Sequence, residues 1–230
     1  MIAAILHSRA YSRLIRWAFE RFYHEFAWTY DVVAALVSAG RWRDWVLTSV
    51  AFAHGRTLEL GCGTGYVQLA LARRHSGAPV GLDRSASMLR LTQRRLARAG
   101  VQAPLVRADA RALPFSAASL DSIIATFPSE YITADATVAE IRRVLRPGGT
   151  VAVALWARFS GDSWYARLVD LAYRLTLQRS PRPVAPTGQA LPDAQQRLGE
   201  RFARAGMCVS YAEAPTTGGT VQYVIAGIAE

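Results

Sequence analysis

The chain has 230 residues, of which 51% are hydrophobic and 10% aromatic. This length suits one globular domain with a sizeable core and a modest extension, and it excludes two full domains. All 27 of its Lys and Arg residues are arginines, which leave a formal net charge of +10 against 17 acidic residues. Such a charge permits attraction to nucleic acid, anionic lipid or acidic metabolites, although the absence of lysine also fits a compositional bias of the genome.

The cysteines and histidines do not indicate a metal site. Cys62 and Cys208 are far apart, and the four histidines are scattered without metal-ligand spacing. Residues 1–9 contain too short an apolar segment for a secretory signal, and no uncharged run reaches the ~18 residues of a membrane span. We therefore expect no bound metal and a cytoplasmic protein.

A helix is predicted near the N-terminus, where apolar residues recur at helical spacing from Tyr11 to Phe26. Arginines, Glu20 and His24 lie on its other side. The helix can pack on the domain, cover a ligand pocket as a lid, or lie on a membrane surface, and its aromatic residues favour the last two roles. We assign residues 1–50 to an N-terminal helical extension or lid and residues 51–230 to the main domain. The Trp42 and Trp45 side chains are expected to anchor the core.

The stretch from Thr57 to Tyr66 predicts a strand, a glycine turn and a helix. Its glycines, Gly61, Gly63 and Gly65, alternate, whereas dinucleotide folds have Gly-x-Gly-x-x-Gly and Walker loops end in Gly-Lys-Ser/Thr. Glycine suits such a turn because it allows positive φ and close approach of a ligand to the backbone. Cys62 inside the turn is expected to pack as a small side chain. A glycine-rich loop without a ligand remains the alternative.

With Glu59 two residues before Gly61, the stretch resembles motif I of the class I S-adenosylmethionine (SAM) methyltransferases. The resemblance implies an α/β fold with a doubly wound, seven-stranded, mostly parallel sheet and antiparallel closing strands. It also implies SAM, S-adenosyl-L-methionine, as the cofactor.

Two acidic residues follow the next predicted strands. Asp83 ends the strand that begins near Ala78 and lies 22 residues after Gly61, the distance at which an open α/β sheet presents a carboxylate to a ribose. Alternatively, Asp83 caps the next helix. Asp109 ends the third predicted strand, residues 104–110. In the helix between them, Arg90, Arg94 and Arg98 form a row that is either a solvated face or a candidate patch for an anion.

Later segments extend the resemblance. Residues 113–127 are similar to the family's Leu-Pro-Phe connection and fourth strand, and residues 141–149 predict a helix that closes in a Pro-Gly-Gly turn before a fifth strand at 150–156. Helices are predicted at 163–178 and 193–205, with a proline-rich loop at 181–192 between them. Two closing strands are predicted at 207–212 and 221–228, joined by a turn at 215–219. Residues 157–205 are thus expected to form a helical insertion.

The resemblance also assigns roles to individual residues. The segment around Tyr30 and Asp31 is similar to the region before motif I in ubiquinone/menaquinone C-methyltransferase-like and phospholipid N-methyltransferase-like proteins, where the tyrosine lies over the methionine end of SAM. Asp83 is expected to accept from the ribose hydroxyls, Asp109 from the adenine amine, and the Ala110 backbone to donate to the ring. The full predicted cofactor set is Tyr30, Glu59, Gly61, Cys62, Gly63, Gly65, Asp83, Arg84, Met88, Asp109, Ala110 and Phe127.

The chemistry implied is methyl transfer, for which the enzyme mainly positions the acceptor and excludes water. If a general base is used, His24, Glu130 and Tyr131 are candidates, and each can instead be structural. The segment after the fourth strand, Phe127-Pro128-Ser129, lacks the Asn-Pro-Pro-Tyr of enzymes that methylate amino groups of nucleic acids, and no Pro-Cys nucleophile is present.

We therefore expect a small or lipophilic acceptor, such as a quinol ring carbon or a phospholipid amine, rather than nucleic acid. Peripheral membrane contact through the N-terminal helix is compatible with this acceptor class. A catalytically silent SAM-binding scaffold and a nicotinamide-dependent oxidoreductase are the alternatives, and the sequence leaves the oligomeric state open.

Overall fold

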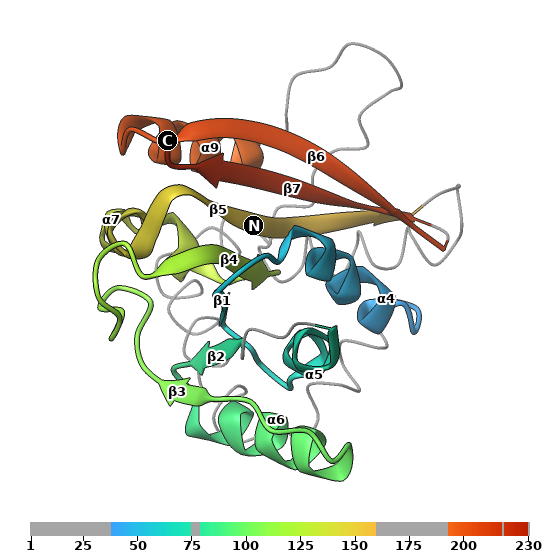
Figure 1. The fold of residues 1–230 in the computed structure, drawn as a ribbon. Coiled ribbons are helices and arrows are strands. Elements are labelled where there is room, and N and C mark those ends of the chain that lie inside the picture. The colour runs from blue at the N-terminus through green and yellow to red at the C-terminus, as the bar shows by residue number, and fades with distance from the viewer. Residues whose placement is uncertain (1–37, 75–78, 160–192, 218, 230) are drawn as a thin grey trace, which may run out of the picture.

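The computed structural model describes residues 38–74, 79–159, 193–217 and 219–229 (Figure 1). Within them, seven strands form one sheet in the order β3-β2-β1-β4-β5-β7-β6. The strands are β1 (Thr57–Leu60), β2 (Val80–Asp83), β3 (Leu105–Arg107), β4 (Leu120–Thr126), β5 (Leu145–Phe159), β6 (Cys208–Thr216) and β7 (Gly219–Gly227). The helices are α4 (Trp42–Leu47), α5 (Tyr66–Arg74), α6 (Ala86–Arg98), α7 (Asp135–Val144) and α9 (Asp193–Arg204), with 3-10 helices η2 (Thr48–Phe52) and η3 (Glu130–Thr133).

The sheet confirms the predicted fold class. Strands β1 to β5 pair in parallel, whereas β7 pairs antiparallel with both β5 and β6. The order reverses at β1, because β2 and β3 follow on one side of it and β4 and β5 on the other. In open α/β sheets such a switch point is where ligands bind, outside the carboxyl ends of the strands.

Helices cover both faces of the sheet (Figure 1). On one face, Val138 and Ile141 of α7 and Leu198 and Phe202 of α9 pack with buried strand residues such as Ile123. On the other face, α4, η2 and α5 pack against alternate strand positions; this side includes Trp45, Val46, Val50, Leu71 and Ile124. Four successive residues of β4, from Ser122 to Ala125, are buried, as a strand covered on both faces requires.

The segment before β1 belongs to this packing. Trp45 is 5% exposed, and it contacts residues of β5 and β7, as the sequence predicted. The Thr48 hydroxyl lies 2.6 Å from the hydroxyl of Tyr223, a fully buried residue of β7. Burial raises the pKa of Tyr223. This hydrogen bond gives the Tyr223 hydroxyl a partner, which a polar group buried in the core requires.

The Pro-Gly-Gly segment differs from the prediction. Helix α7 ends at Val144, and Leu145 is already extended at the start of β5, so the helix does not run through Arg146. Proline disfavours the helical conformation in the residue before it, and Arg146 precedes Pro147. Gly148, at φ +74°, donates its N–H to the Ile228 carbonyl at 3.0 Å, which ties the turn to the end of the chain.

The other boundaries also shift. Strands β6 and β7 extend through most of the predicted 215–219 turn, because Pro215 lies on an edge strand, where a missing N–H is tolerated. Strand β3 is shorter than predicted, since the chain turns at Asp109, whose carboxylate accepts from the Arg111 N–H. The predicted helices at 11–26 and 163–178 and the loop at 181–192 lie outside the described residues.

We predict that Phe202→Ala lowers the free energy of unfolding by about 3–5 kcal/mol, because the ring is fully buried between α9 and the sheet. Urea unfolding measures this change. Gln196→Ala, on the exposed side of the same helix, is the control and should stay within about 0.5 kcal/mol of the unsubstituted protein. Equal losses in the two variants would contradict the docking of α9.

Candidate functional site

The glycine turn lies between the end of β1 and the start of α5. All three of its glycines have positive φ, at +79° for Gly61, +52° for Gly63 and +83° for Gly65. The N–H groups of Gly61 and Cys62 both donate to the Leu82 carbonyl of β2, at 2.8 and 2.9 Å. The turn is therefore held against the neighbouring strand in a conformation that side chains rarely adopt.

The three glycines serve different purposes. A Cβ at Gly65 would lie 2.6 Å from Cγ2 of Thr92, and one at Gly61 would lie 2.6 Å from the Tyr131 hydroxyl. A Cβ at Gly63 would meet no described protein atom closer than the Gly61 carbonyl oxygen at 4.0 Å. Packing of the protein thus requires glycine at two positions, whereas at Gly63 the open space is available to a ligand.

Asp83, at the end of β2, holds the turn and the next helix together. Its Oδ2 accepts from the Gly63 N–H at 2.9 Å, and its Oδ1 accepts from the Ser85 N–H at 2.8 Å. The N-cap of α6 is Ser85, whose hydroxyl accepts from the Met88 N–H at 3.4 Å, so Asp83 is not the cap. Burial raises the pKa of Asp83, while the two N–H donors oppose the shift. Each carboxylate oxygen keeps a second lone pair for a hydroxyl donor.

Glu59, on β1, is a buried carboxyl with an unpaired oxygen. It is 2% exposed, and its Oε2 has no hydrogen-bond partner in the described structure. Burial, and then the nearby Asp83 charge, raise its pKa well above the usual range. It lines a cavity of about 40 Å³ beside the turn, together with Trp42, Val46, Gly61, Cys62, Gly63, Thr64, Gly65, Tyr66, Val67 and Thr126. A buried carboxyl with one unpaired oxygen in such a cavity suits a cationic ligand group.

Two residues of α6 that sequence reasoning missed also fix the turn. The Thr92 hydroxyl donates to the Gly63 carbonyl at 2.8 Å and lies 3.9 Å from the Cys62 sulfur. The Arg95 guanidinium lies 3.5 Å from the centre of the Tyr66 ring and donates to the Thr64 hydroxyl at 3.4 Å. The sequence offered one signal for Thr92: it lies between Met88 and Leu96 on the buried side of the helix, where a hydroxyl needs a hydrogen-bond partner.

The remaining predicted cofactor residues lie at or near the same edge of the sheet. Asp109 follows β3 and is partly exposed; hydrogen bonds from the Arg111 backbone, and then the Arg111 charge, lower its pKa. Ala110 and Met88 are buried. Arg84 is exposed, and its carbonyl accepts from Nε of Arg107.

The rings of Trp42 and Phe127 contact each other beside the turn, and we call this pair the aromatic wall. Phe127, which follows β4, adopts φ +45°, and its ring centroid lies 4.9 Å from that of Trp42 and 6.3 Å from that of Trp45. Trp42 also lines the cavity, so it is more than a core anchor. A non-glycine residue at positive φ in a site is a strained position that the surrounding structure must enforce.

Of the candidate bases, only Tyr131 is seen at the turn. Its hydroxyl donates to the Leu60 carbonyl at 3.1 Å, one residue before Gly61. Glu130, its neighbour on η3, is exposed, and no described hydrogen bond or ion pair joins it to the turn. His24 and the predicted cofactor residue Tyr30 lie outside the described residues.

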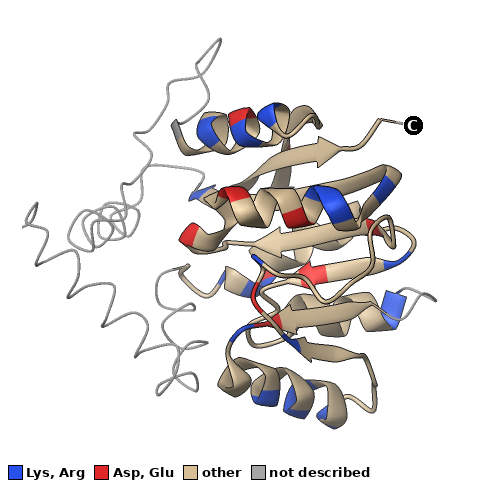
Figure 2. Cartoon of the chain, turned by 90° about the vertical axis from the view of Figure 1, so that its left-hand side faces the viewer, with Lys and Arg blue, Asp and Glu red and all other residues tan. Residues whose placement is uncertain are grey.

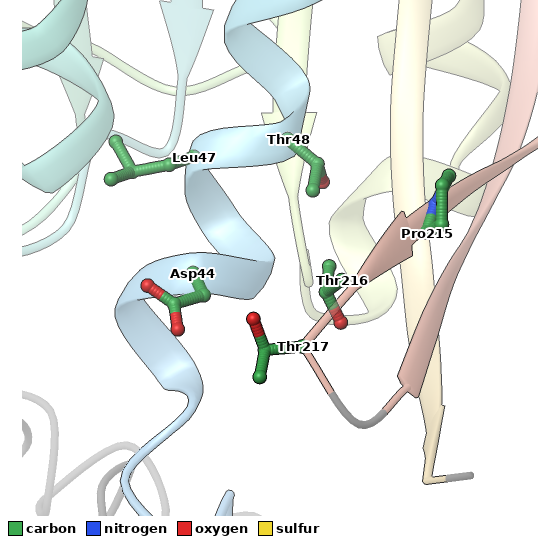
Figure 3. A pocket seen from close by; sticks show the side chains of 6 residues that line it. All are labelled: Asp44, Leu47, Thr48, Pro215, Thr216 and Thr217. Carbon is green, nitrogen blue, oxygen red and sulfur yellow. The ribbon is translucent and has the colours of Figure 1, made fainter.

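A second hollow, of about 490 Å³, lies between α4 and the β6–β7 hairpin (Figure 3). It is lined by Asp44, Leu47, Thr48, Pro215, Thr216 and Thr217. None of the predicted site residues lines it, so the glycine turn remains the candidate site. Elsewhere in the described part of the chain, no group of three His, Cys, Asp or Glu side chains could hold a metal ion, and no helix is long and apolar enough to cross a membrane.

Comparison with known proteins agrees with this geometry. Residues 57–149, from β1 to the Pro-Gly-Gly segment, match the family model of a methyltransferase domain. This part of the chain is a methyltransferase domain. The match covers the glycine turn, Glu59 and Asp83. These residues are therefore part of the methyltransferase domain.

The chain is 36% identical over 140 residues to the ubiquinone/menaquinone biosynthesis C-methyltransferase UbiE of Burkholderia mallei. The aligned region is 57% of this chain and 57% of that protein. The chain thus matches a little over half the length of the curated relative.

Two solved structures share the fold. A SAM-dependent methyltransferase of Methanococcus maripaludis aligns with a TM-score of 0.57 at 15% identity, over 95% of this chain and 94% of that chain. A Haemonchus contortus N-methyltransferase, in complex with phosphomonomethylethanolamine and S-adenosylhomocysteine, aligns with a TM-score of 0.58 at 14% identity, over 83% of this chain and 53% of that chain. At these identities the likeness concerns the methyltransferase fold alone.

We predict that Gly63→Ala separates ligand binding from stability. Its positive φ should cost about 1–2 kcal/mol of folding free energy, whereas the methyl group in the open space should weaken S-adenosylhomocysteine binding by about tenfold or more. Gly65→Ala, which also displaces Thr92, should cost roughly 2–5 kcal/mol of stability. Urea unfolding and calorimetric titration measure the two effects. Unchanged binding by a folded Gly63→Ala protein would contradict the assignment.

Glu59 predicts a pH dependence of stability. Its native pKa is raised above the ordinary 4.5, so its contribution is fully present below pH 4.5 and is lost as pH rises through the native pKa. Relative to the unsubstituted protein, Glu59→Gln should therefore gain stability as pH rises from 4.5 to neutral. Urea unfolding across this range, without ligand, measures the difference. A constant difference would show that the native pKa of Glu59 is not shifted, and a change in the opposite sense would show that it is lowered; either result would contradict the assignment.

Proposed function

We propose that this chain transfers the methyl group of SAM to a small lipophilic acceptor, with a quinol-like ring as the acceptor class. The observation that carries the cofactor assignment is the open space at Gly63, with the Asp83 carboxylate and the unpaired Oε2 of Glu59 beside it. The acceptor class is supported by the similarity to the ubiquinone/menaquinone biosynthesis C-methyltransferase over the domain that contains this turn.

The residues present fit SAM. Asp83 has lone pairs left to accept from two ribose hydroxyls, and the unpaired oxygen of Glu59 suits the ammonium of the methionine part. Asp109 and Ala110, at the end of β3, are on the side where the adenine would lie. Arg95 and Thr92 hold the turn that all these groups surround. Tyr30 is proposed to complete the methionine end from outside the described residues.

The bound cofactor supplies a methyl group that its sulfonium has already activated. The protein therefore has to hold the acceptor in line with the methyl group and keep water out. The wall formed by Trp42 and Phe127 suits this task, because a flat ring acceptor can pack against aromatic side chains. Trp42 also lines the cavity that contains Glu59. An acceptor packed against Trp42 would therefore lie next to the methionine part of the cofactor.

Methylation of a ring carbon releases a proton. Tyr131 is the candidate base that the structure brings to the turn, where its hydroxyl is bound to the Leu60 carbonyl. This bond also gives it a structural role, because it closes the space above Gly61. We propose that Tyr131 positions the turn and the acceptor, while proton transfer falls to it, to His24 or to solvent.

The proposal is tested by incubating the protein with methyl-labelled SAM and two acceptor classes. A short-chain quinol without its ring methyl group should become labelled on a ring carbon, whereas phosphatidylethanolamine in detergent micelles should not. Gly63→Ala is the control and should lower labelling in parallel with cofactor binding. If S-adenosylhomocysteine binds but neither acceptor is labelled, the chain acts as a SAM-binding scaffold or on another acceptor class. Labelling of the lipid amine alone would overturn the quinol assignment.

A further inference from the structure

One face of α6 carries a row of arginines that form no ion pair with the part of the chain that the structure describes. Arg90, Arg94 and Arg98 are all exposed and follow one another at four-residue intervals. With a rise of about 1.5 Å per residue, the row is about 12 Å long. In Figure 2 the helix at the lower end of the sheet carries blue segments and no red ones. We call Arg90, Arg94 and Arg98 the α6 arginine face.

Among the described residues, no carboxylate is seen to pair with this face. No Asp or Glu occurs between Asp83 and Asp109 in the sequence, although this stretch holds six arginines. The hydrogen bond described for the face is from Arg90 to the neutral Ser87 hydroxyl, at 3.3 Å. Elsewhere in the described structure, arginines pair with carboxylates: Arg143 with Glu140, Arg146 with Asp121, and Arg201 with Asp135.

Composition alone does not account for this arrangement. Replacement of lysine by arginine explains which basic residue is used, but it does not explain why acids are absent from one helix and present on α7 and α9. Like charges four residues apart destabilise a helix, and Arg90, Arg94 and Arg98 form two such pairs. Attraction to an anionic surface bound to the face would offset this repulsion.

We propose that the α6 arginine face docks the protein on an anionic lipid membrane. The face is the convex side of one helix, which suits contact with a planar array of charges. It offers no aromatic ring for stacking on bases: the exposed large hydrophobic residue of the described chain is Tyr211, on β6 at the opposite edge of the sheet. Choosing a membrane over nucleic acid rests in part on the proposed lipophilic acceptor, which would reside in such a membrane.

The place of the face in the fold fits this role. Helix α6 begins three residues after Asp83, so the face starts at the rim of the cofactor site. Docking would bring that rim close to the lipid surface without covering the glycine turn, because Thr92 and Arg95 face the turn from another side of the helix. Since no large hydrophobic side chain of α6 is fully exposed for insertion, attachment should depend mainly on charge and weaken with salt.

Sedimentation with vesicles tests the proposal. The probes are vesicles of phosphatidylcholine alone and of equal parts phosphatidylcholine and phosphatidylglycerol, each at low and high salt. The unsubstituted protein should bind the anionic vesicles at low salt and be released by high salt. Substituting all three arginines (R90Q/R94Q/R98Q) should weaken binding by about fivefold per arginine, on the order of a hundredfold in total.

The control removes the same charge elsewhere, with R142Q/R197Q/R204Q on α7 and α9, and should reduce binding far less. S-adenosylhomocysteine titration shows that each variant is folded, and neither triple variant should change it, so failure of docking is distinguishable from failure of the proposed function. The proposal is overturned if the unsubstituted protein ignores anionic vesicles, or if both triple variants lose binding equally. Tighter binding to an oligonucleotide than to vesicles, lost in the α6 variant, would assign the face to nucleic acid instead.

Discussion

The arrangement of the site depends on one carboxylate that accepts two backbone hydrogen bonds. Asp83 binds the Gly63 N–H with one oxygen and the Ser85 N–H with the other, so the end of β2, the glycine turn and the start of α6 are joined at one residue. The geometry follows from the sheet order, because β1 and β2 are parallel neighbours and their carboxyl ends meet. Without this acceptor, the Gly63 N–H would lose its partner while Thr92 still held the Gly63 carbonyl.

The same constraint places two acidic side chains close together in a site that admits little water. Burial raises the pKa of both carboxyl groups, and the nearby Asp83 charge raises the pKa of Glu59 further. An apo protein therefore carries an unfavourable electrostatic arrangement, which a ligand with an ammonium and a sulfonium would relieve. Binding sites of this kind lower the stability of the protein without its ligand. Phe127, at φ +45° beside the site, is a second residue whose conformation costs stability.

Most of the sheet, and the position of the glycine turn with the acids beside it, could be predicted from sequence, because both depend on local patterns. Alternating glycines after a short apolar run, and acids at the ends of the following strands, appear directly in the chain. Thr92 and Arg95 were missed because their partners in the turn lie about thirty residues away in sequence, and only the packing of α6 brings them together. The early end of α7 could have been predicted from Pro147, since the residue before a proline leaves the helical conformation. The acceptor side could not be predicted, because the segments expected to form it carry no motif tied to one chemistry.

The central claim is that the glycine turn, with Asp83 and Glu59 around it, binds a sulfonium nucleoside. Calorimetric titration of the folded protein with S-adenosylhomocysteine, SAM and NAD tests it most directly. We expect saturable one-to-one binding of the first two and no binding of NAD. Folded protein that gives no heat with either nucleoside, or that binds NAD as well as it binds them, would contradict it.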